Sequence, residues 1–325
     1  MTFNLASRYR LAPRLAAIAA VVTTIAVVAI LVGWGRLAVG AEATPPGDVA
    51  LQPVLAGLQA RDAAITSASA DYTFETEENQ DPAVLAYRDP DMGPSAARRV
   101  IEGHWAFDRR SFYEDHRLVY PEVAEELSFN AFDGQQGRAY DAAAKWGEET
   151  PADWMSNSLT ALSQVGAWLH LAHNFKLDEP TQGKLLLDAK ATVVNDAADL
   201  NGVKCFLLEA KDGKRTECWW VSPDRGWLVL KHERSVGAYN DEIVARKATW
   251  TIQECAEVDG VWMPTVLTGL SEHTWADGRT LWRIKQKLTL TYQDVNKPVP
   301  ATTFQPTFPT GTRVLGSSGI HVAGE

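Results

Sequence analysis

A pair of histidines and a serine cluster come closest in spacing to a metal-binding or catalytic pattern. His170 and His173 lie three residues apart on a predicted helix, so both imidazoles could reach one metal ion. A zinc site would need a third ligand, which the sequence does not place. The cluster Gly316-Ser317-Ser318-Gly319 is one residue short of the nucleophile motif G-x-S-x-G, and there is no P-loop and no H-E-x-x-H. We therefore expect no catalytic residue, no metal and no cofactor, and a protein that is not an enzyme.

Two of the three cysteines are candidates for a disulfide. Cys205 and Cys218 flank the predicted turn Lys211-Asp212-Gly213-Lys214, so they could face each other across a hairpin. Such a bridge would contribute roughly 3 kcal/mol. A simple two-residue turn would set Cys205 opposite Trp220, so the bridge would also need a bulge or a longer loop. The sequence leaves the disulfide and the free thiols as equal alternatives.

The N-terminus has the three parts of an export signal. Arg8, Arg10 and Arg14 precede a run without charge from Leu15 to Gly35, and small residues of the A-x-A type follow. That run is longer than a typical signal core of about 7–15 residues and suits a membrane span of roughly 20. Residues 1–43 are therefore predicted to be a cleaved export signal or a retained membrane anchor. Either outcome places the rest of the chain in the periplasm or cell envelope, secreted after cleavage or anchored in the inner membrane by residues 15–35.

The exported part is strongly acidic. The whole chain has 31 Lys and Arg against 41 Asp and Glu, a net charge of −10. Residues 1–43 contain four Arg and one Glu, so the remainder has 27 basic and 40 acidic residues and a net charge near −13. A protein with this charge repels phosphate backbones, which argues against nucleic-acid binding.

The hydrophobic pattern predicts few helices and many strands. After a linker at 44–48, Leu51, Leu55, Leu58 and Ile65 recur at helical spacing and predict a helix over 49–66. A second helix is predicted within 152–175. Apolar and polar residues alternate in most of the remainder, which predicts strands at 70–75, 101–108, 112–119, 127–132, 137–141, 184–194, 202–210, 216–222, 227–236, 246–255, 261–272 and 279–292.

These elements predict a mainly β fold of the α+β class. Short turns between successive strands indicate an antiparallel meander. About eleven strands would curl into an unclosed barrel, with two or three helices at its concave face and the N-terminal hydrophobic helix before it. The domain would span 49–314, and 315–325 would be a flexible tail.

The concave face is predicted to be rich in Trp, Leu and Ile, and two interpretations are open. It is either a packed core or an apolar cavity for a lipid or acyl chain. The strand faces supply the candidate cavity residues, which are Trp105, Phe107, Trp250, Ile252, Trp282, Ile284 and Leu288.

Several turn and aromatic motifs also follow one another in a recognisable order. They are Ala70-Asp71-Tyr72-Thr73-Phe74, Gly103-His104-Trp105-Ala106-Phe107, Phe112-Tyr113-Glu114, Asp133-Gly134 with Tyr140-Asp141, Trp219 to Trp227, Asp259-Gly260-Val261-Trp262-Met263-Pro264-Thr265, and Phe308-Pro309-Thr310-Gly311-Thr312-Arg313-Val314. Their order, over residues 49–314, resembles the outer-membrane lipoprotein carrier (LolA-like) superfamily.

The resemblance implies an unclosed antiparallel barrel with helices in its mouth. It also implies an extracytoplasmic protein that holds the acyl chain of a lipid or lipoprotein in the barrel. The alternative is a membrane-anchored envelope sensor or scaffold that acts through a protein partner. The N-terminal segment would supply the membrane contact in either case.

Overall fold

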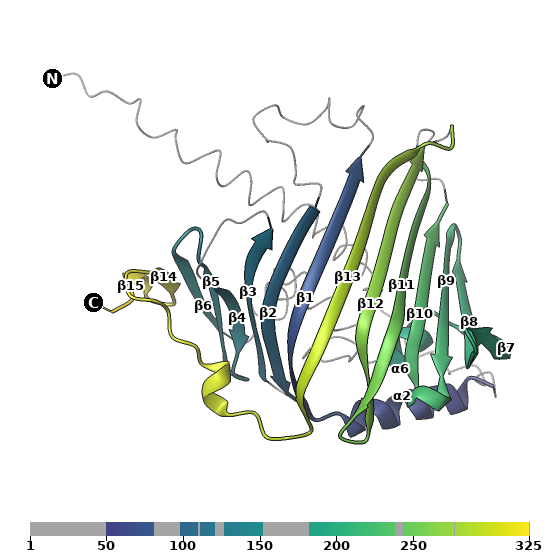
Figure 1. Cartoon of the computed structure of the whole chain (residues 1–325), viewed down its shortest axis with the longest axis horizontal. Helices are drawn as coiled ribbons and strands as arrows, with labels where there is room; N and C mark the ends of the chain where they lie inside the picture. Colours follow the sequence, from purple (N-terminus) through teal and green to yellow (C-terminus); the bar gives the residue numbers. More distant parts are fainter. Residues whose placement is uncertain are drawn as a thin grey trace, which may run out of the picture.

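The computed structural model describes residues 50–80, 98–109, 111–120, 127–151, 182–237, 243–275 and 277–324. Most of these residues belong to one large sheet (Figure 1). Its strands are β1 (Ser67–Gln80), β2 (Arg98–Asp108), β3 (Ser111–Tyr120), β4 (Ser128–Phe132), β5 (Gln136–Asp141), β6 (Trp146–Pro151), β7 (Thr192–Leu200), β8 (Val203–Asp212), β9 (Arg215–Ser222), β10 (Leu228–Val236), β11 (Ile243–Val258), β12 (Val261–Trp275), β13 (Thr280–Val295), β14 (Arg313–Gly316) and β15 (Gly319–Val322). The helices in these ranges are α2 (Gln52–Ala64), α6 (Gln182–Asp188) and the short 3-10 helices η1 (Pro223–Arg225) and η2 (Ala301–Phe304).

The strand order shows that the sheet is not closed. It runs β15-β14-β6-β5-β4-β3-β2-β1-β13-β12-β11-β10-β9-β8-β7, with β15 and β7 at its two ends. Every pairing is antiparallel except the one between β14 and β6. The pairing of β1 with β13 joins the first and last parts of the domain. The prediction of a mainly β, mostly antiparallel and unclosed sheet is confirmed, with fifteen strands in place of about eleven.

Tight turns account for the meander. Asp259 and Gly260 have φ angles of 49° and 80° and connect β11 to β12, as a two-residue hairpin turn of the Asp-Gly type requires. Asn201 and Gly202, with φ angles of 55° and 83°, connect β7 to β8 in the same way. These turns place strands that are neighbours in sequence beside each other in space.

Five predicted segments differ from the structure or lie outside the described residues. Residues 182–188 form α6 where a strand over 184–194 was predicted, because a short apolar run cannot be assigned to helix or strand by periodicity. Residues 313–322 form the hairpin β14–β15, where a flexible tail was predicted from residue 315. The predicted helix within 152–175, the linker at 44–48 and the hydrophobic segment of 1–43 lie outside the described residues. Within the described ranges, no helix has the length and apolar character to span a membrane.

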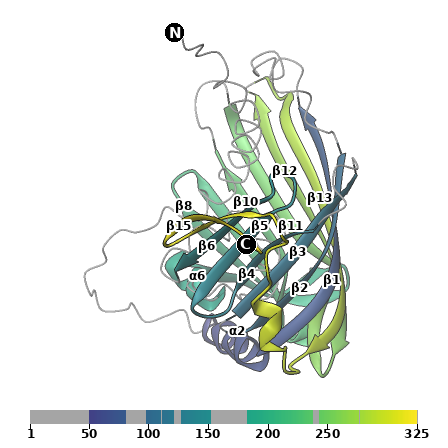
Figure 2. The same cartoon turned by 90° about the vertical axis from the view of Figure 1, so that its left-hand side faces the viewer.

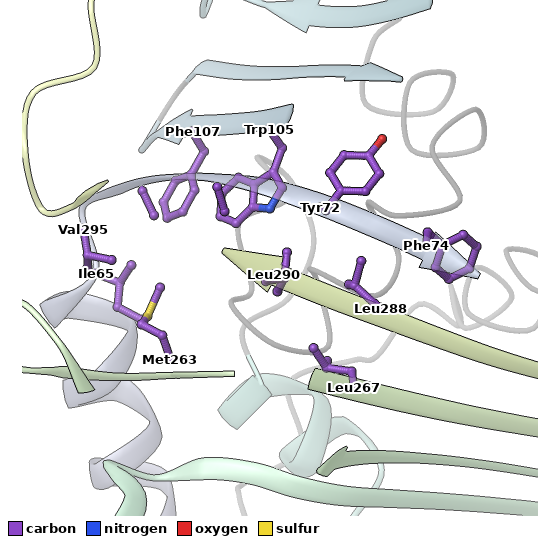
Figure 3. Close-up of a cluster of buried hydrophobic side chains, with 12 residues drawn as sticks. Ile65, Tyr72, Phe74, Trp105, Phe107, Met263, Leu267, Leu288, Leu290 and Val295 are labelled. Atoms are coloured by element: carbon purple, nitrogen blue, oxygen red, sulfur yellow. The ribbon is translucent and has the colours of Figure 1, made fainter. Parts of the chain in front are cut away.

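One face of the sheet carries most of the buried apolar side chains, and we call it the inner face. Figure 2 shows the sheet curving around the side on which α2 and α6 lie. Its central cluster comes from the start of β1 and from β2, β12 and β13 (Figure 3), and consists of Ile65, Ala68, Ala70, Tyr72, Phe74, Trp105, Phe107, Met263, Leu267, Leu288, Leu290 and Val295. Its helix cluster joins α2 and α6 to β8 and β9, and consists of Leu51, Val54, Leu58, Leu186, Ala191, Leu208, Ala210, Trp219 and Val221.

The helix α2 is held against the sheet by two specific contacts. A Cβ atom at Gly57 would lie 2.0 Å from the ring of Trp227, so only glycine allows this approach. Arg61 is buried, and its Nη1 donates a hydrogen bond to the carbonyl oxygen of Trp262 at 2.7 Å. Burial lowers the pKa of Arg61 to about 10. These two contacts fix the position of α2 against the sheet.

Candidate functional site

The structure places all seven predicted cavity residues on the inner face, but with different access. Four of them are buried, with 0–8% of their surface exposed: Trp105, Phe107, Ile284 and Leu288. The rings of Trp105 and Phe107 stack at 5.5 Å and form part of the central cluster. Trp250, Ile252 and Trp282 are only partly buried. The role of all seven in ligand binding stays a prediction.

Trp250 and Ile252 line a pocket where the central cluster meets the helix cluster. The other lining residues come from α6, β9, β10, β11 and β12, and they are Gln182, Trp219, Val229, His232, Thr251 and Leu267. The free space in the pocket is about 20 Å³, which is room for about one water molecule. Trp282 lies elsewhere on the inner face, where its indole Nε1 donates to Glu78 Oε1 at 2.7 Å.

His232 is the most unusual residue of the pocket because its ring lies between two indoles. Trp219 and Trp250 stand directly opposite His232 on the neighbouring strands β9 and β11. The ring centroids of His232 and Trp219 are 5.0 Å apart with planes 10° apart, and those of His232 and Trp250 are 5.3 Å apart with planes 25° apart. Cross-strand packing of this kind fixes the imidazole plane.

A buried carboxylate also fixes how the His232 ring is turned within its own plane. Nε2 of His232 lies 3.2 Å from Oε2 of Glu217, whose side chain is only 8% exposed. Arg215 donates to Oε1 of Glu217, and Arg234 Nε lies 3.5 Å from the same oxygen. Burial alone would raise the pKa of Glu217, but the hydrogen bond to His232 and the charges of His232, Arg215 and Arg234 outweigh it and lower the pKa to about 2. Glu217 is therefore ionised and accepts hydrogen bonds only, so Nε2 of His232 carries a hydrogen.

Sequence reasoning missed two key residues of this site. Trp219 entered only as part of a turn motif, and His232 was not considered. The signal that identifies them is the cross-strand register, which aligns Trp219, His232 and Trp250 in one row over three strands. The register between strands cannot be derived from periodicity or composition.

Of the two alternatives left open for Cys205 and Cys218, the structure has the free thiols. The hairpin turns at Gly213 and Lys214, which sets Cys218 opposite Glu209, four residues away from Cys205. No bulge interrupts this pairing between β8 and β9, so nothing brings the two sulfur atoms together. Burial raises the pKa of the Cys205 thiol to about 11.

The other candidates for chemistry contribute no site to the described structure. Among the described residues, no group of three His, Cys, Asp or Glu side chains could hold a metal ion. His170 and His173 lie outside those residues. Ser317 and Ser318 are exposed in the turn between β14 and β15.

A second depression lies on the outer face of the sheet and is polar. It is lined by side chains from β1, β2, β3 and β13, including Asp71, Glu102, His104 and Arg117. Nδ1 of His104 lies 3.0 Å from Oδ1 of Asp71. Polar and charged side chains predominate in the lining of this open depression, although Leu127 also lines it, whereas the inner pocket is more enclosed and has mainly apolar walls.

Comparison with known proteins identifies no family for this chain. No protein-family model and no curated protein matches it. Among solved structures, the chain is similar to a DUF1329 family protein from Desulfovibrio piger, with 12% identity, 78% of this chain and 96% of that chain covered, and a TM-score of 0.34. It is also similar to an uncharacterized conserved protein from Thermus thermophilus, with 8% identity, coverage of 82% and 98%, and a TM-score of 0.29. A structure describing lipid–protein interactions in lipovitellin has 9% identity, coverage of 73% and 26%, and a TM-score of 0.29. None of these three descriptions names the LolA-like superfamily, and membership in it stays a prediction.

Proposed function

We propose that this chain is an extracytoplasmic protein that binds the acyl chain of a lipid or lipoprotein on the inner face of its sheet. The observation that carries the proposal is the inner pocket. Its walls are mainly apolar, Trp250 and Ile252 are among its partly exposed lining residues, and it lies between two buried apolar clusters. A concave apolar site with few polar groups is the usual form of a binding site for an apolar ligand.

The size of the pocket sets a condition on how binding would occur. Space of about 20 Å³ does not hold an acyl chain, so a ligand must push side chains apart as it enters. The partly exposed Trp250 and Ile252 are the residues that would move. Leu267, which also lines the pocket and is buried in the central cluster, would stay in place beside them.

The proposal is tested by titrating a fluorescent fatty acid into the chain purified from its producing cell and stripped of lipid. The variant Val229→Thr/Ile252→Thr makes two walls of the pocket polar without creating a large cavity. Placing a hydroxyl against a hydrocarbon chain costs about 1–3 kcal/mol. We therefore expect binding weakened about tenfold or more.

The matched control is Val203→Thr/Val266→Thr, which changes two half-buried valines that do not line the pocket. It should leave the affinity within about twofold of the unmodified chain, a change well under 1 kcal/mol. If the unmodified chain takes up no fatty acid, or if both double variants weaken binding equally, the lipid-binding proposal fails. The chain would then be better described as a membrane-anchored envelope sensor or scaffold, which predicts capture of a protein partner and an uncleaved N-terminus.

A further inference from the structure

The end of the inner face nearest to α2 is apolar and is covered by that helix. Figures 1 and 2 show α2 across one end of the sheet. There the carbonyl oxygen of Ala64 accepts a hydrogen bond from Nδ2 of Asn296 at 2.8 Å. The central cluster extends from this end as far as three cross-strand neighbours, which we call the apolar row: Phe74, Leu267 and Leu288. An acyl chain against the apolar row can therefore extend only away from α2, because the helix covers the other direction.

Away from α2, the inner face becomes polar along β12 and β13. Leu267 pairs with Leu288 in the apolar row. Six residues farther along each strand His273 pairs with Trp282, and we call these two residues the polar pair. Gln286 lies between the apolar row and the polar pair on β13. Because side chains alternate between the two faces of a strand, residues six apart lie on the same face. The polar pair is therefore on the inner face, farther from α2 than the apolar row is.

The polar pair has hydrogen-bonding side chains at partly exposed positions. The rings of His273 and Trp282 have centroids 5.0 Å apart, and Nε1 of Trp282 donates to Oε1 of Glu78 at 2.7 Å. Burial and the charge of Arg246 lower the pKa of His273 to about 4, so at neutral pH its ring offers one donor and one acceptor. Tryptophan is enriched where an apolar environment meets a wet one. The polar pair therefore suits the head of an amphiphile, and the apolar row suits its chain.

The distance between the apolar row and the polar pair is also that of an acyl chain. Leu288 and Trp282 are six residues apart on β13, which is about 20 Å at roughly 3.3 Å per residue. The hydrocarbon core of a bilayer is about 30 Å thick, so one lipid chain spans about 15 Å of it. A chain whose methyl end lies against Leu267 and Leu288 would thus bring its head close to His273 and Trp282.

We infer that the ligand is an amphiphile that lies along β12 and β13, with its methyl end against the apolar row and its polar head beside the polar pair. The inference rests on the proposed function and adds the class of the ligand and its direction on the inner face. A wholly apolar ligand would have no reason to take one direction, because both of its ends are alike.

Two spin-labelled fatty acids measure this direction. One is stearate with a nitroxide next to its carboxylate, and the other is stearate with the nitroxide near its methyl end. The reporters are the indole N–H signals of Trp282 and of Trp105, which lies in the central cluster. Their neighbours on β1 are Gln80 and Ala70, ten residues or about 33 Å apart. A nitroxide broadens the NMR signals of nearby nuclei, so one label cannot affect both reporters equally if the ligand has one direction.

In spectra of the unmodified chain, the head-labelled stearate should reduce the Trp282 signal more than the Trp105 signal, and the tail-labelled stearate should do the reverse. Spectra recorded after the nitroxide is reduced with ascorbate are the reference, because reduction removes the broadening and leaves the ligand in place. The two signals are identified by their absence from Trp282→Phe and Trp105→Phe.

The opposite pattern, or equal broadening of both reporters by both labels, would overturn the inference and leave the proposed function standing. If neither stearate changes any indole signal, with or without its nitroxide, the chain binds no fatty acid. That result would overturn the proposed function and the inference with it.

Discussion

The substitution Glu217→Gln tests whether the buried charge cluster stabilises the fold as the structure indicates. The pKa of Glu217 is about 2, against an ordinary value of 4.5. This difference of about 2.5 units corresponds to about 3 kcal/mol of folding free energy at neutral pH. Because the folded pKa is the lower one, the stabilisation is complete above pH 4.5 and is lost as the pH falls toward 2.

The assay is urea denaturation of the unmodified chain and of Glu217→Gln at a series of pH values. Glutamine has nearly the same shape but no charge, and it leaves Arg234 buried beside a neutral group. We expect the variant to be less stable by about 3 kcal/mol at pH 7, with the deficit shrinking toward zero near pH 2.

The matched control is Glu272→Gln on the outer face of β12. Glu272 accepts a hydrogen bond from Arg283 at 2.6 Å, but the two side chains are 26% and 41% exposed. Exposed ion pairs contribute about 0–1 kcal/mol, so this variant should lose less than about 1 kcal/mol. Equal losses for the two variants at pH 7, or a Glu217→Gln deficit that persists at pH 2, would refute the electrostatic account of the cluster.

Two further predictions concern the packing of α2 and the cysteines. In Gly57→Ala the new Cβ would meet the Trp227 ring at 2.0 Å. Although alanine is the better helix former, thermal denaturation should show that the variant loses about 1–3 kcal/mol of folding free energy. A variant more stable than the unmodified chain would contradict the observed packing. Thiol titration of the denatured, unreduced protein should count all three cysteines as free, and a count of one would mean that a disulfide forms. In the folded protein Cys205 should react most slowly, because burial raises its pKa to about 11.

The type of fold could be predicted from the sequence because its dominant signals are local. Strand β13 alternates so regularly that Trp282, Ile284, Leu288 and Leu290 could be assigned to one face, and the structure places them there. The turn at Asp259-Gly260 was equally readable, since that dipeptide favours one hairpin geometry. Where the hydrophobic pattern is ambiguous, as in the short apolar run that forms α6, a strand was predicted in place of the observed helix.

The pocket could be predicted only in part because it depends on register between strands. The β8–β9 turn lies at Gly213-Lys214, one residue later than a turn at Asp212-Gly213. This difference of one residue in the turn changes every cross-strand pairing between β8 and β9 by two residues. The row of Trp219, His232 and Trp250 depends on two such registers, one of them between β10 and β11. Alternation identified Trp250 and Ile252 as inward-facing residues, but it could not show that His232 lies beside them.

Native mass spectrometry of the chain purified without detergent from its producing cell tests the central claim most directly. The account predicts a species carrying one acyl-chain lipid, which is lost in Val229→Thr/Ile252→Thr and retained in Val203→Thr/Val266→Thr. A chain that is free of lipid as isolated, and that remains free after incubation with excess fatty acid, would contradict the claim that the inner face is a lipid-binding site.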